Sequence, residues 1–195
     1  VLYDDFAGRK IRFIGDCIHG IMVEGTAQTT DDAETAKNAL LCAAAMRSSF
    51  NLAMSELKAA EVDAGDLGLA IGVEHGVVSV TRLGIKGERT RCCISRSVLA
   101  SEREQKRCNG RQTAMGPELY KHAPEQFQTL FGAARRRADF DYVAAEEALN
   151  PKAEARKAST LSGGLLQPAT GTAAVAGFAF GKVAAQPSNS QRGFA

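Results

Sequence analysis

The sequence predicts an α+β fold in which an antiparallel sheet is covered by helices. Two segments, 9–22 and 67–83, combine β-branched and other apolar residues with glycines, which is typical of paired strands. Between them, the segment from residue 31 to about residue 60 has apolar residues at spacings of three and four, as in a helix with one buried face. The order strand pair, helix, strand pair, helix therefore favours the α+β class.

The first strand pair is expected within residues 1–24. Residues 7–10 supply a turn, and β-forming side chains stand on either side of Gly15, namely Ile11, Phe13, Ile18 and Ile21. The second pair is expected within residues 67–83, where Glu74-His75-Gly76 interrupts the apolar pattern. We expect His75 to lie in that turn.

The segment between the strand pairs has a helix start signal. Asp31, with Glu34 three residues later, resembles a capping box. The apolar stripe that follows comprises Leu40, Ala43, Met46, Phe50, Met54 and Leu57. Residues 92–107 then change from extended to helical character. Residues 115–131 indicate a short helix, and residues 142–149 indicate a helix or a strand-to-helix joint.

The composition changes towards the C-terminus. We divide the chain into a domain at residues 1–150 and an extension at residues 151–195 that is rich in Gly, Ala and Ser. The extension is either a flexible tail or a segment whose apolar patches, at Leu165-Leu166 and at residues 175–180, dock on the domain or on a partner. The sequence leaves both possibilities open.

Composition places the chain among globular proteins of the cytoplasm. Its 195 residues are 45% hydrophobic and 24% charged, and the net charge of +2 is too small to indicate binding to nucleic acid. No apolar stretch reaches the roughly 20 residues needed to span a bilayer, and no signal peptide is recognisable. Five cysteines without CxxC spacing and three histidines argue against a zinc cluster and favour free thiols in a reducing compartment.

Two hairpin motifs resemble the catalytic domain of class III nucleotidyl cyclases. Residues 12–18, Arg-Phe-Ile-Gly-Asp-Cys-Ile, resemble the family's K-x-I-G-D-x-x-M hairpin. Residues 70–78, followed by Leu83-Gly84, resemble its R-I-G-I-x-x-G-x-V hairpin with the later I-G. The resemblance covers roughly residues 1–130 and implies the ferredoxin-like fold of this family, with cyclisation of a nucleoside triphosphate as the activity.

Asp16 is the candidate metal ligand. In the family, two divalent ions, Mn²⁺ or Mg²⁺, carry the triphosphate charge, and hard cations of this kind prefer carboxylate oxygens. The family's other metal aspartate lies in an F-x-D-I-x-G-F motif that the chain lacks. We expect that motif upstream of Val1, the alternative being an inactive copy. Asp16 could instead be a turn residue bonded to its own backbone.

Arg12 occupies the position that the family uses to select the base, where lysine marks adenine and glutamate marks guanine. The position that pairs with it falls at Thr90 or Arg91, neither of which is a carboxylate. An arginine offers only donors, which suits the two carbonyl oxygens of uracil. The chain is therefore most similar to the pyrimidine cyclases of bacterial anti-phage Pycsar systems, with UTP as the substrate and a separate effector that cyclic UMP activates. Arg12 could instead pair with a surface carboxylate.

The transition-state residues of the family are poorly matched. Its N-x-x-x-R pattern falls on Val98 and Glu102, so we assign Ser97 and Arg103, one residue away from each, as candidates. Arginine suits the charge that develops on a transferring phosphate. Arg96 and Arg107 are further candidates, and a solvated charged helix is the alternative. The family places metal and base residues on different subunits, which implies a homodimer with composite sites.

Two other interpretations remain open. The chain could be a degenerate cyclase-like domain that binds a nucleotide or a partner without chemistry. It could also be a small α+β interaction domain, since shape alone implies no activity.

Overall fold

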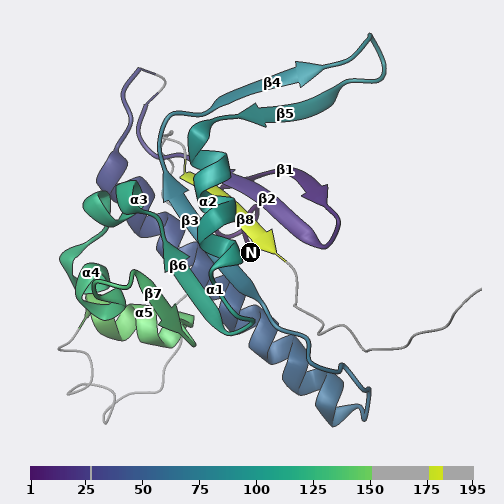
Figure 1. The fold of residues 1–195 in the computed structure, drawn as a ribbon, viewed down its shortest axis with the longest axis vertical. Helices are drawn as coiled ribbons and strands as arrows, with labels where there is room; N and C mark the ends of the chain where they lie inside the picture. Colours follow the sequence, from purple (N-terminus) through teal and green to yellow (C-terminus); the bar gives the residue numbers. More distant parts are fainter. Residues whose placement is uncertain (27, 151–175, 182–195) are drawn as a thin grey trace, which may run out of the picture.

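The computed structural model describes residues 1–26, 28–150 and 176–181, without the side chains of Arg12, Ile14, Arg91 and residues 176–181. Its elements, shown in Figure 1, are β1 (Arg9–Ile14), β2 (Cys17–Met22), α1 (Asp32–Ala59), β3 (Ala70–His75), β4 (Ser79–Leu83), β5 (Thr90–Ile94), α2 (Arg96–Lys106), β6 (Gln112–Met115), α3 (Pro117–His122), α4 (Glu125–Phe131), β7 (Arg136–Ala138), α5 (Tyr142–Leu149) and β8 (Ala176–Gly181).

A sheet with the strand order β1-β2-β8-β3-β6-β7 forms the centre of the molecule, and β4 and β5 form a separate ribbon. Neighbouring strands are antiparallel except for β3 and β6, which are parallel. Helices pack on this sheet, so the predicted α+β class is confirmed (Figure 1).

The second predicted strand pair is wrong in its partners. The two halves of residues 67–83 form β3 and β4, but β4 pairs with β5, and β3 pairs with β8 and β6. The physical reason is the break at Gly76, whose φ of +153° favours glycine and turns the chain out of the main sheet. His75 is the last residue of β3 rather than a turn residue.

Helix α1 follows the predicted pattern. The Asp31 carboxylate accepts a hydrogen bond of 2.9 Å from the Glu34 backbone N–H and so caps the helix. Its inner face contributes Ala36, Ala39, Leu40, Ala43 and Ala44 to the hydrophobic core, together with Met22, Ile71, Val73, Met115 and Phe127 from other elements.

Helices α1 and α2 lie on opposite faces of β3. Ile71 and Val73 belong to the core that α1 covers. Between them, Gly72 faces α2: a Cβ atom there would lie 2.2 Å from the Gln105 backbone nitrogen and 2.3 Å from the Ser101 carbonyl oxygen. Only glycine allows α2 to approach this closely, and the approach fixes α2 over the centre of the sheet.

One charged side chain, Arg47 of α1, lies inside this core with 1% of its surface exposed. Its guanidinium donates hydrogen bonds to the carbonyl oxygens of Gly110 and Gln112, both at 3.1 Å, and to that of Leu69. Arg47 therefore joins α1 to the loops that precede β3 and β6.

The C-terminal extension contributes to the sheet. Residues 176–181 form β8 between β2 and β3, so part of the apolar patch at residues 175–180 lies in the fold. The patch at Leu165-Leu166 lies outside the described residues, and the division at residue 150 stays a prediction. Within the described ranges, no helix is long and apolar enough to cross a membrane.

Candidate active site

Asp16 lies at the tip of the β1–β2 hairpin. The strands pair in antiparallel register, with Ile14 opposite Cys17, and Gly15 adopts a φ of +61° that makes the tight turn possible. The Asp16 side chain is exposed, and its carboxylate makes no hydrogen bond or ion pair with any other described residue.

Other turns of the chain show what a structural turn residue does. The Asp63 carboxylate accepts a hydrogen bond of 2.8 Å from the Gly65 N–H, and the Asn109 side chain accepts one of 2.9 Å from the Arg111 N–H. Asp16 lacks such a bond among the described residues although it also stands beside a glycine with positive φ. The alternative of a turn-stabilising aspartate therefore finds no support, and the carboxylate is available to a ligand.

The donor set for two divalent ions is incomplete around Asp16. Among the described residues no group of three or more histidine, cysteine, aspartate or glutamate side chains could hold a metal ion. The exposed carboxylate of Asp16 is suited to be one oxygen ligand of a hard cation. A complete site requires oxygen ligands in addition to it.

The predicted base-recognition residues lie on two different strands. Arg12 is in the central part of β1 with its backbone opposite His19, next to a bulge in the β1–β2 register. Thr90 and Arg91 begin β5, where Thr90 is exposed and pairs with Leu83 of β4. Strands β1 and β5 contact each other, so the fold brings the two predicted elements together. The side chains of Arg12 and Arg91 lie outside the description.

Ser97 lies in the first turn of α2, against the end of β3. The Ser95 hydroxyl caps this helix by accepting a 2.9 Å hydrogen bond from the Ser97 N–H. A Cβ atom on Gly76 would lie 2.2 Å from the Ser97 hydroxyl oxygen, so the two residues are in close contact.

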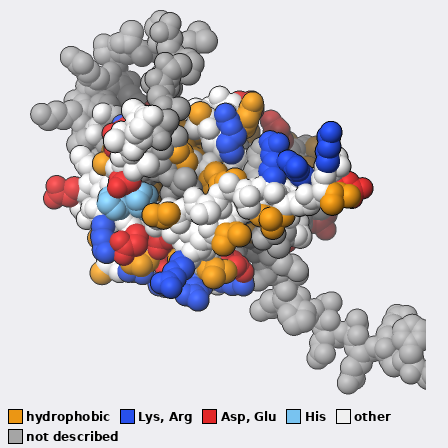
Figure 2. Space-filling model, turned by 90° about the horizontal axis from the view of Figure 1, so that it is seen from above, with side chains coloured by type: hydrophobic (Ala, Val, Ile, Leu, Met, Phe, Trp, Pro, Cys, Tyr) orange, Lys and Arg blue, Asp and Glu red, His pale blue; other side chains and the backbone are white. Residues whose placement is uncertain are grey.

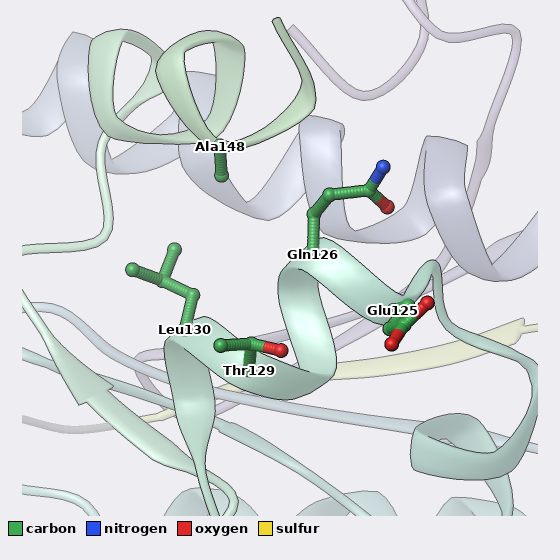
Figure 3. A pocket seen from close by; sticks show the side chains of 5 residues that line it. All are labelled: Glu125, Gln126, Thr129, Leu130 and Ala148. Atoms are coloured by element: carbon green, nitrogen blue, oxygen red, sulfur yellow. The ribbon is translucent and has the colours of Figure 1, made fainter. Parts of the chain in front are cut away.

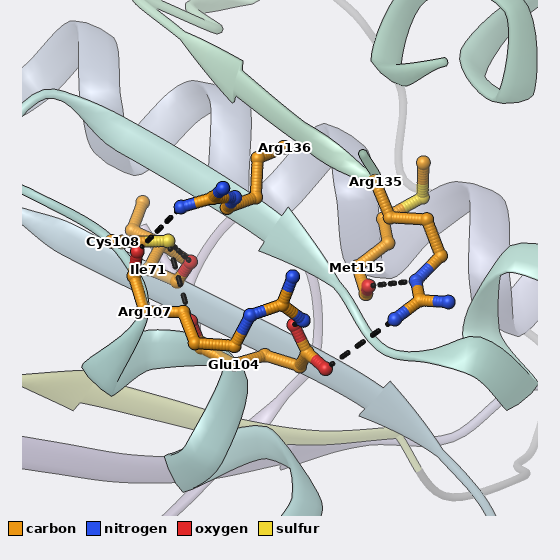
Figure 4. A network of polar contacts seen from close by, with 7 residues as sticks. All are labelled: Ile71, Glu104, Arg107, Cys108, Met115, Arg135 and Arg136. Carbon is orange, nitrogen blue, oxygen red and sulfur yellow. Dashed lines mark hydrogen bonds and ion pairs between the residues drawn. The ribbon is translucent and has the colours of Figure 1, made fainter. Parts of the chain in front are cut away.

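The arginines proposed around α2 differ in whether their side chains could bind a phosphate group. Arg107 forms a 2.5 Å ion pair with Glu104, and Arg135 approaches the same carboxylate at 3.7 Å (Figure 4). The pair between Arg107 and Glu104 lies within the end of α2 and occupies the Arg107 side chain. The end of α2 is joined to the segment around β7 by Arg135 and by a 2.8 Å hydrogen bond from Arg136 to the Arg107 carbonyl oxygen. Arg103 is exposed, and no hydrogen bond or ion pair joins its side chain to another described residue.

The register of the sheet separates Asp16 from Ser97 along the strands. Through β8, His19 of β2 lies level with Gly72 of β3, and Met22 lies level with His75. Asp16 is therefore at the end of the sheet where β3 begins, and Ser97 is at the end where β3 stops. Asp16 is level with Leu69, and Ser97 contacts Gly76. These positions are seven residue steps apart along β3, or about 23 Å at about 3.3 Å for each step. One chain does not bring these two residues together.

Sequence reasoning missed a polar cluster at the end of β3. The Glu74 carboxylate is buried and accepts hydrogen bonds of 2.9 Å from the backbone N–H groups of His75 and Leu119. It thereby caps α3, whose own N-cap, Gly116, has no side chain. Burial raises the pKa of Glu74, and the two N–H donors oppose this shift. Its position after an apolar run gave no signal of this role.

His75 belongs to the same cluster. Its Nε2 atom lies 3.2 Å from the Asp32 carboxylate at the start of α1, and its ring centroid lies 4.5 Å from that of His122. Burial, followed by the charge of His122, lowers the pKa of His75, while Asp32 acts in the opposite direction. The cluster ties α1, β3 and α3 together.

The structure does not support a catalytic role for the thiols of Cys42 and Cys108. Burial raises the pKa of Cys42 to about 12 and that of Cys108 to about 11, so both thiols are protonated and unreactive at neutral pH. The five cysteines, all within the described residues, form no disulfide.

Two surface hollows lie away from these residues. One, of about 420 Å³, lies between α4 and α5, with Gln126, Leu130 and Ala148 around it (Figure 3). The other, of about 580 Å³, lies at the C-terminal end of α1 and is lined by Met54, Lys58 and Asp63 among others. Neither is lined by a predicted site residue.

The fold and the hairpin motifs together define a class III cyclase-like domain. A crystal structure of a class III adenylyl cyclase-like ATP-binding protein from Pseudomonas aeruginosa matches with a TM-score of 0.73 and 49% identity, over 76% of this chain and 31% of that one. The predicted resemblance and the predicted fold are thereby confirmed. No family model matches the chain.

Two curated relatives of the chain are both named uridylate cyclases. A uridylate cyclase from Pseudomonas aeruginosa is 49% identical over 149 residues, which are 76% of this chain and 29% of that protein. A uridylate cyclase from a Rhizobium species is 47% identical over 131 residues, which are 67% of this chain and 24% of that protein. The chain thus spans less than a third of the length of the curated relatives that it matches.

Proposed function

We propose that this chain is the catalytic part of a uridylate cyclase, which converts UTP to 3′,5′-cyclic UMP and pyrophosphate. The single observation that carries the proposal is the exposed Asp16 carboxylate, which stands unpaired among the described residues at the tip of the hairpin that matches the cyclase motif. The 47–49% identity to two uridylate cyclases supports the same activity and base.

The reaction joins the ribose 3′-oxygen to the α-phosphorus and breaks the bond between that phosphorus and pyrophosphate. Divalent ions, Mn²⁺ or Mg²⁺, would carry the triphosphate charge and increase the acidity of the 3′-hydroxyl. In this proposal Asp16 is one of their ligands. Arg103 donates hydrogen bonds to the phosphate oxygens on which charge develops, and Ser97 positions the ribose.

Recognition of the base falls to Arg12, assisted by Thr90 or Arg91. Uracil presents two carbonyl oxygens, whereas adenine presents an amino donor beside its ring nitrogens. A guanidinium has donors only, so Arg12 favours uracil over adenine. The solved relative is described as ATP-binding, which makes ATP the competitor that a test has to include.

Composite sites between two copies of the chain explain the separation of Asp16 from Ser97. Strands β4 and β5 project as a ribbon whose apolar side chains are exposed, with Val80 at 44%, Leu83 at 56% and Ile94 at 63%. A two-stranded ribbon is marginally stable alone. Figure 2 shows hydrophobic side chains among basic and acidic ones on the face seen from above. A second copy that packs on the ribbon would bury the exposed apolar side chains of β4 and β5. We therefore propose a homodimer.

The biological role that we propose rests on the resemblance to the pyrimidine cyclases of Pycsar systems. Cyclic UMP made on infection would be a second messenger that activates a separate effector protein, so we propose a role in anti-phage defence and a site of action in the cytoplasm.

The test of this function incubates the full natural protein with ATP, GTP, CTP and UTP in equal amounts, with Mn²⁺ and separately with Mg²⁺. We expect cyclic UMP as the main product. Cyclic AMP as the main product would overturn the role assigned to Arg12, and the absence of any cyclic nucleotide would overturn the assigned activity.

A second candidate function is a degenerate cyclase-like domain that binds a nucleotide or a partner without chemistry. Val98 and Glu102 at the positions of the family's asparagine and arginine favour it. It predicts that radiolabelled UTP binds in an equilibrium assay but is recovered unchanged.

A further inference from the structure

The turn at residues 132–136, which leads from the end of α4 into β7, holds an arginine in an unusual conformation. Arg135 has a φ of +50°, in the left-handed region that residues with a Cβ atom seldom adopt. Its N–H donates to the Gly132 carbonyl oxygen at 3.0 Å, and its own carbonyl oxygen accepts from the Met115 N–H at 2.8 Å. Its Nε atom also donates to the Met115 carbonyl oxygen at 3.2 Å. Because backbone strain persists only where the surroundings enforce it, this turn fixes the direction of the Arg135 side chain.

Arg135 points toward Glu104 of α2 (Figure 4). Its guanidinium lies 3.7 Å from the Glu104 carboxylate, and Glu104 is only 7% exposed. Water and salt screen a buried pair less than a surface pair. The pair of Glu104 with Arg107 stays within α2, whereas the pair with Arg135 joins α2 to another part of the fold.

Two further contacts fasten the same end of α2. Arg136, also from this turn, donates a 2.8 Å hydrogen bond to the Arg107 carbonyl oxygen, one of the carbonyl groups that a helix end leaves without a partner inside the helix. The Cys108 thiol, directly after α2, lies 3.6 Å from the Ile71 carbonyl oxygen of β3. The end of α2 is thus held by polar contacts to β3 and to the turn before β7.

These polar contacts supply what the close approach at Gly72 does not. The contact at Gly72 sets the distance between α2 and β3, but a glycine has no side chain that would fix the rotation of the helix about its axis. The buried residues of α2 are Ser101, Glu104 and Gln105, all of them small or polar. An ion pair from one of them to a rigid turn fixes the rotation.

The rotation of α2 decides where Arg103 and Ser97 point. Arg103 is exposed and directly precedes the buried Glu104, so the two side chains leave the helix about 100° apart. Side chains reach about 6 Å from a helix axis, so a rotation of about 20° moves their ends by about 2 Å. A displacement of about 1 Å at a reacting group can cost about 100-fold in rate.

We propose that Glu104 and Arg135 are positioning residues of the cyclase reaction. Their ion pair sets the rotation of α2, and through it the aim of Arg103 and Ser97 at the phosphate and the ribose. Neither of the pair touches the nucleotide in this proposal. The inference rests on the proposed function, because Arg103 and Ser97 are assigned there.

The test compares three variants of the full natural protein at a temperature where all of them are folded. Arg135→Met removes the guanidinium and keeps the length of the side chain, and Glu104→Gln removes the carboxylate charge with almost no change in shape. Arg137→Met is the matched control, since Arg137 lies exposed on β7, two residues from Arg135. If R135M does not fold, E104Q carries the test.

R135M and E104Q are expected to lower kcat for cyclic UMP formation by at least about 10-fold, with the KM for UTP within about 2-fold of the original. R137M should keep both constants. The double variant R135M/E104Q should be no slower than R135M, because each single change already breaks the same pair. A kcat of R135M within about 2-fold of that of R137M, or a double variant slowed by the product of the two single effects, would overturn the proposal.

Amide hydrogen exchange, read by mass spectrometry without substrate, separates this proposal from the proposed function. R135M should speed exchange in residues 101–107 of α2 and leave residues 35–47 of α1 unchanged, whereas R137M should change neither segment. A protein without any cyclase activity would remove the proposed function and leave this exchange pattern as the test of the positioning contact. Equal exchange of α2 in R135M and R137M would show that Arg135 does not hold the helix.

Discussion

The buried Arg47 offers a prediction whose size follows from its contacts. Its guanidinium donates to the carbonyl oxygens of Leu69, Gly110 and Gln112, and no carboxylate lies within ion-pair distance of it among the described residues. The Gly110 oxygen also accepts a 2.7 Å hydrogen bond from the Leu69 N–H, so it keeps one partner when the arginine is removed. Burial lowers the pKa of Arg47, because a charged group is less well solvated inside the protein than in water.

Arg47→Met keeps the length of the side chain and removes its donors. The carbonyl oxygens of Leu69 and Gln112 each lose a buried hydrogen bond, at about 1–3 kcal/mol for each group left unsatisfied. Relief of the buried charge and the added apolar packing offset part of this loss. We expect a net destabilisation of about 2–4 kcal/mol, a large share of the roughly 5–15 kcal/mol that holds a typical domain together.

Urea denaturation of the whole chain, followed by far-UV circular dichroism, measures this change as a lower midpoint at an unchanged slope. Arg137→Met is the matched control, since Arg137 is exposed on β7 and should change stability by less than about 0.5 kcal/mol. If R47M and R137M unfold at the same urea concentration, Arg47 does not hold the two loops to α1.

Three further predictions concern the sheet and the base. Glu74→Gln should stabilise the chain at pH 7, because burial raises the pKa of Glu74 and penalises its charged form, and this advantage should vanish in melts well below pH 4.5, where both states are protonated. Gly72→Ala should lower the unfolding free energy by about 2–3 kcal/mol, because its Cβ would lie 2.2 Å from the backbone of α2; unchanged urea unfolding would contradict the contact. Arg12→Ala should reduce the preference for UTP over ATP in a mixed-substrate assay, whereas Lys10→Ala on the same strand should leave it unchanged.

Local sequence signals were sufficient for several elements. The hairpin around Gly15 and the helix that begins after Asp31 depend on turns, caps and periodicity within a few residues of one another. For residues 142–149 the same signals left a helix and a strand-to-helix joint open, and the structure has the helix α5 there. The exposure of Asp16 was predicted from the turn at Gly15, whereas its role as a metal ligand was inferred from the resemblance of residues 12–18 to the cyclase hairpin and stays a prediction.

The parts that could not be predicted depend on partners far away in the sequence. Nothing near β4 indicates that it pairs with β5 instead of β3, and the composition of residues 176–181 is as typical of a tail as of a central strand. Glu74 was predicted only as part of a break between two strands. Its buried role could not be predicted, because its partner, the Leu119 N–H, lies 45 residues further along the chain. Arg47 has the sequence pattern of an exposed helical arginine, and only the two loops beside it make it a buried one.

The most direct measurement of the central claim compares Asp16→Asn with Asp63→Asn in the full natural protein. Both residues are exposed aspartates close to a glycine with positive φ, so both changes should leave the free energy of unfolding in urea within about 0.5 kcal/mol of that of the unmodified protein. D16N is expected to lose at least about 100-fold in the rate of cyclic UMP formation, or about 2.7 kcal/mol of transition-state stabilisation, while D63N keeps the full rate. Equal rates for the two variants would contradict the claim that Asp16 binds the metal ions of a nucleotidyl cyclase.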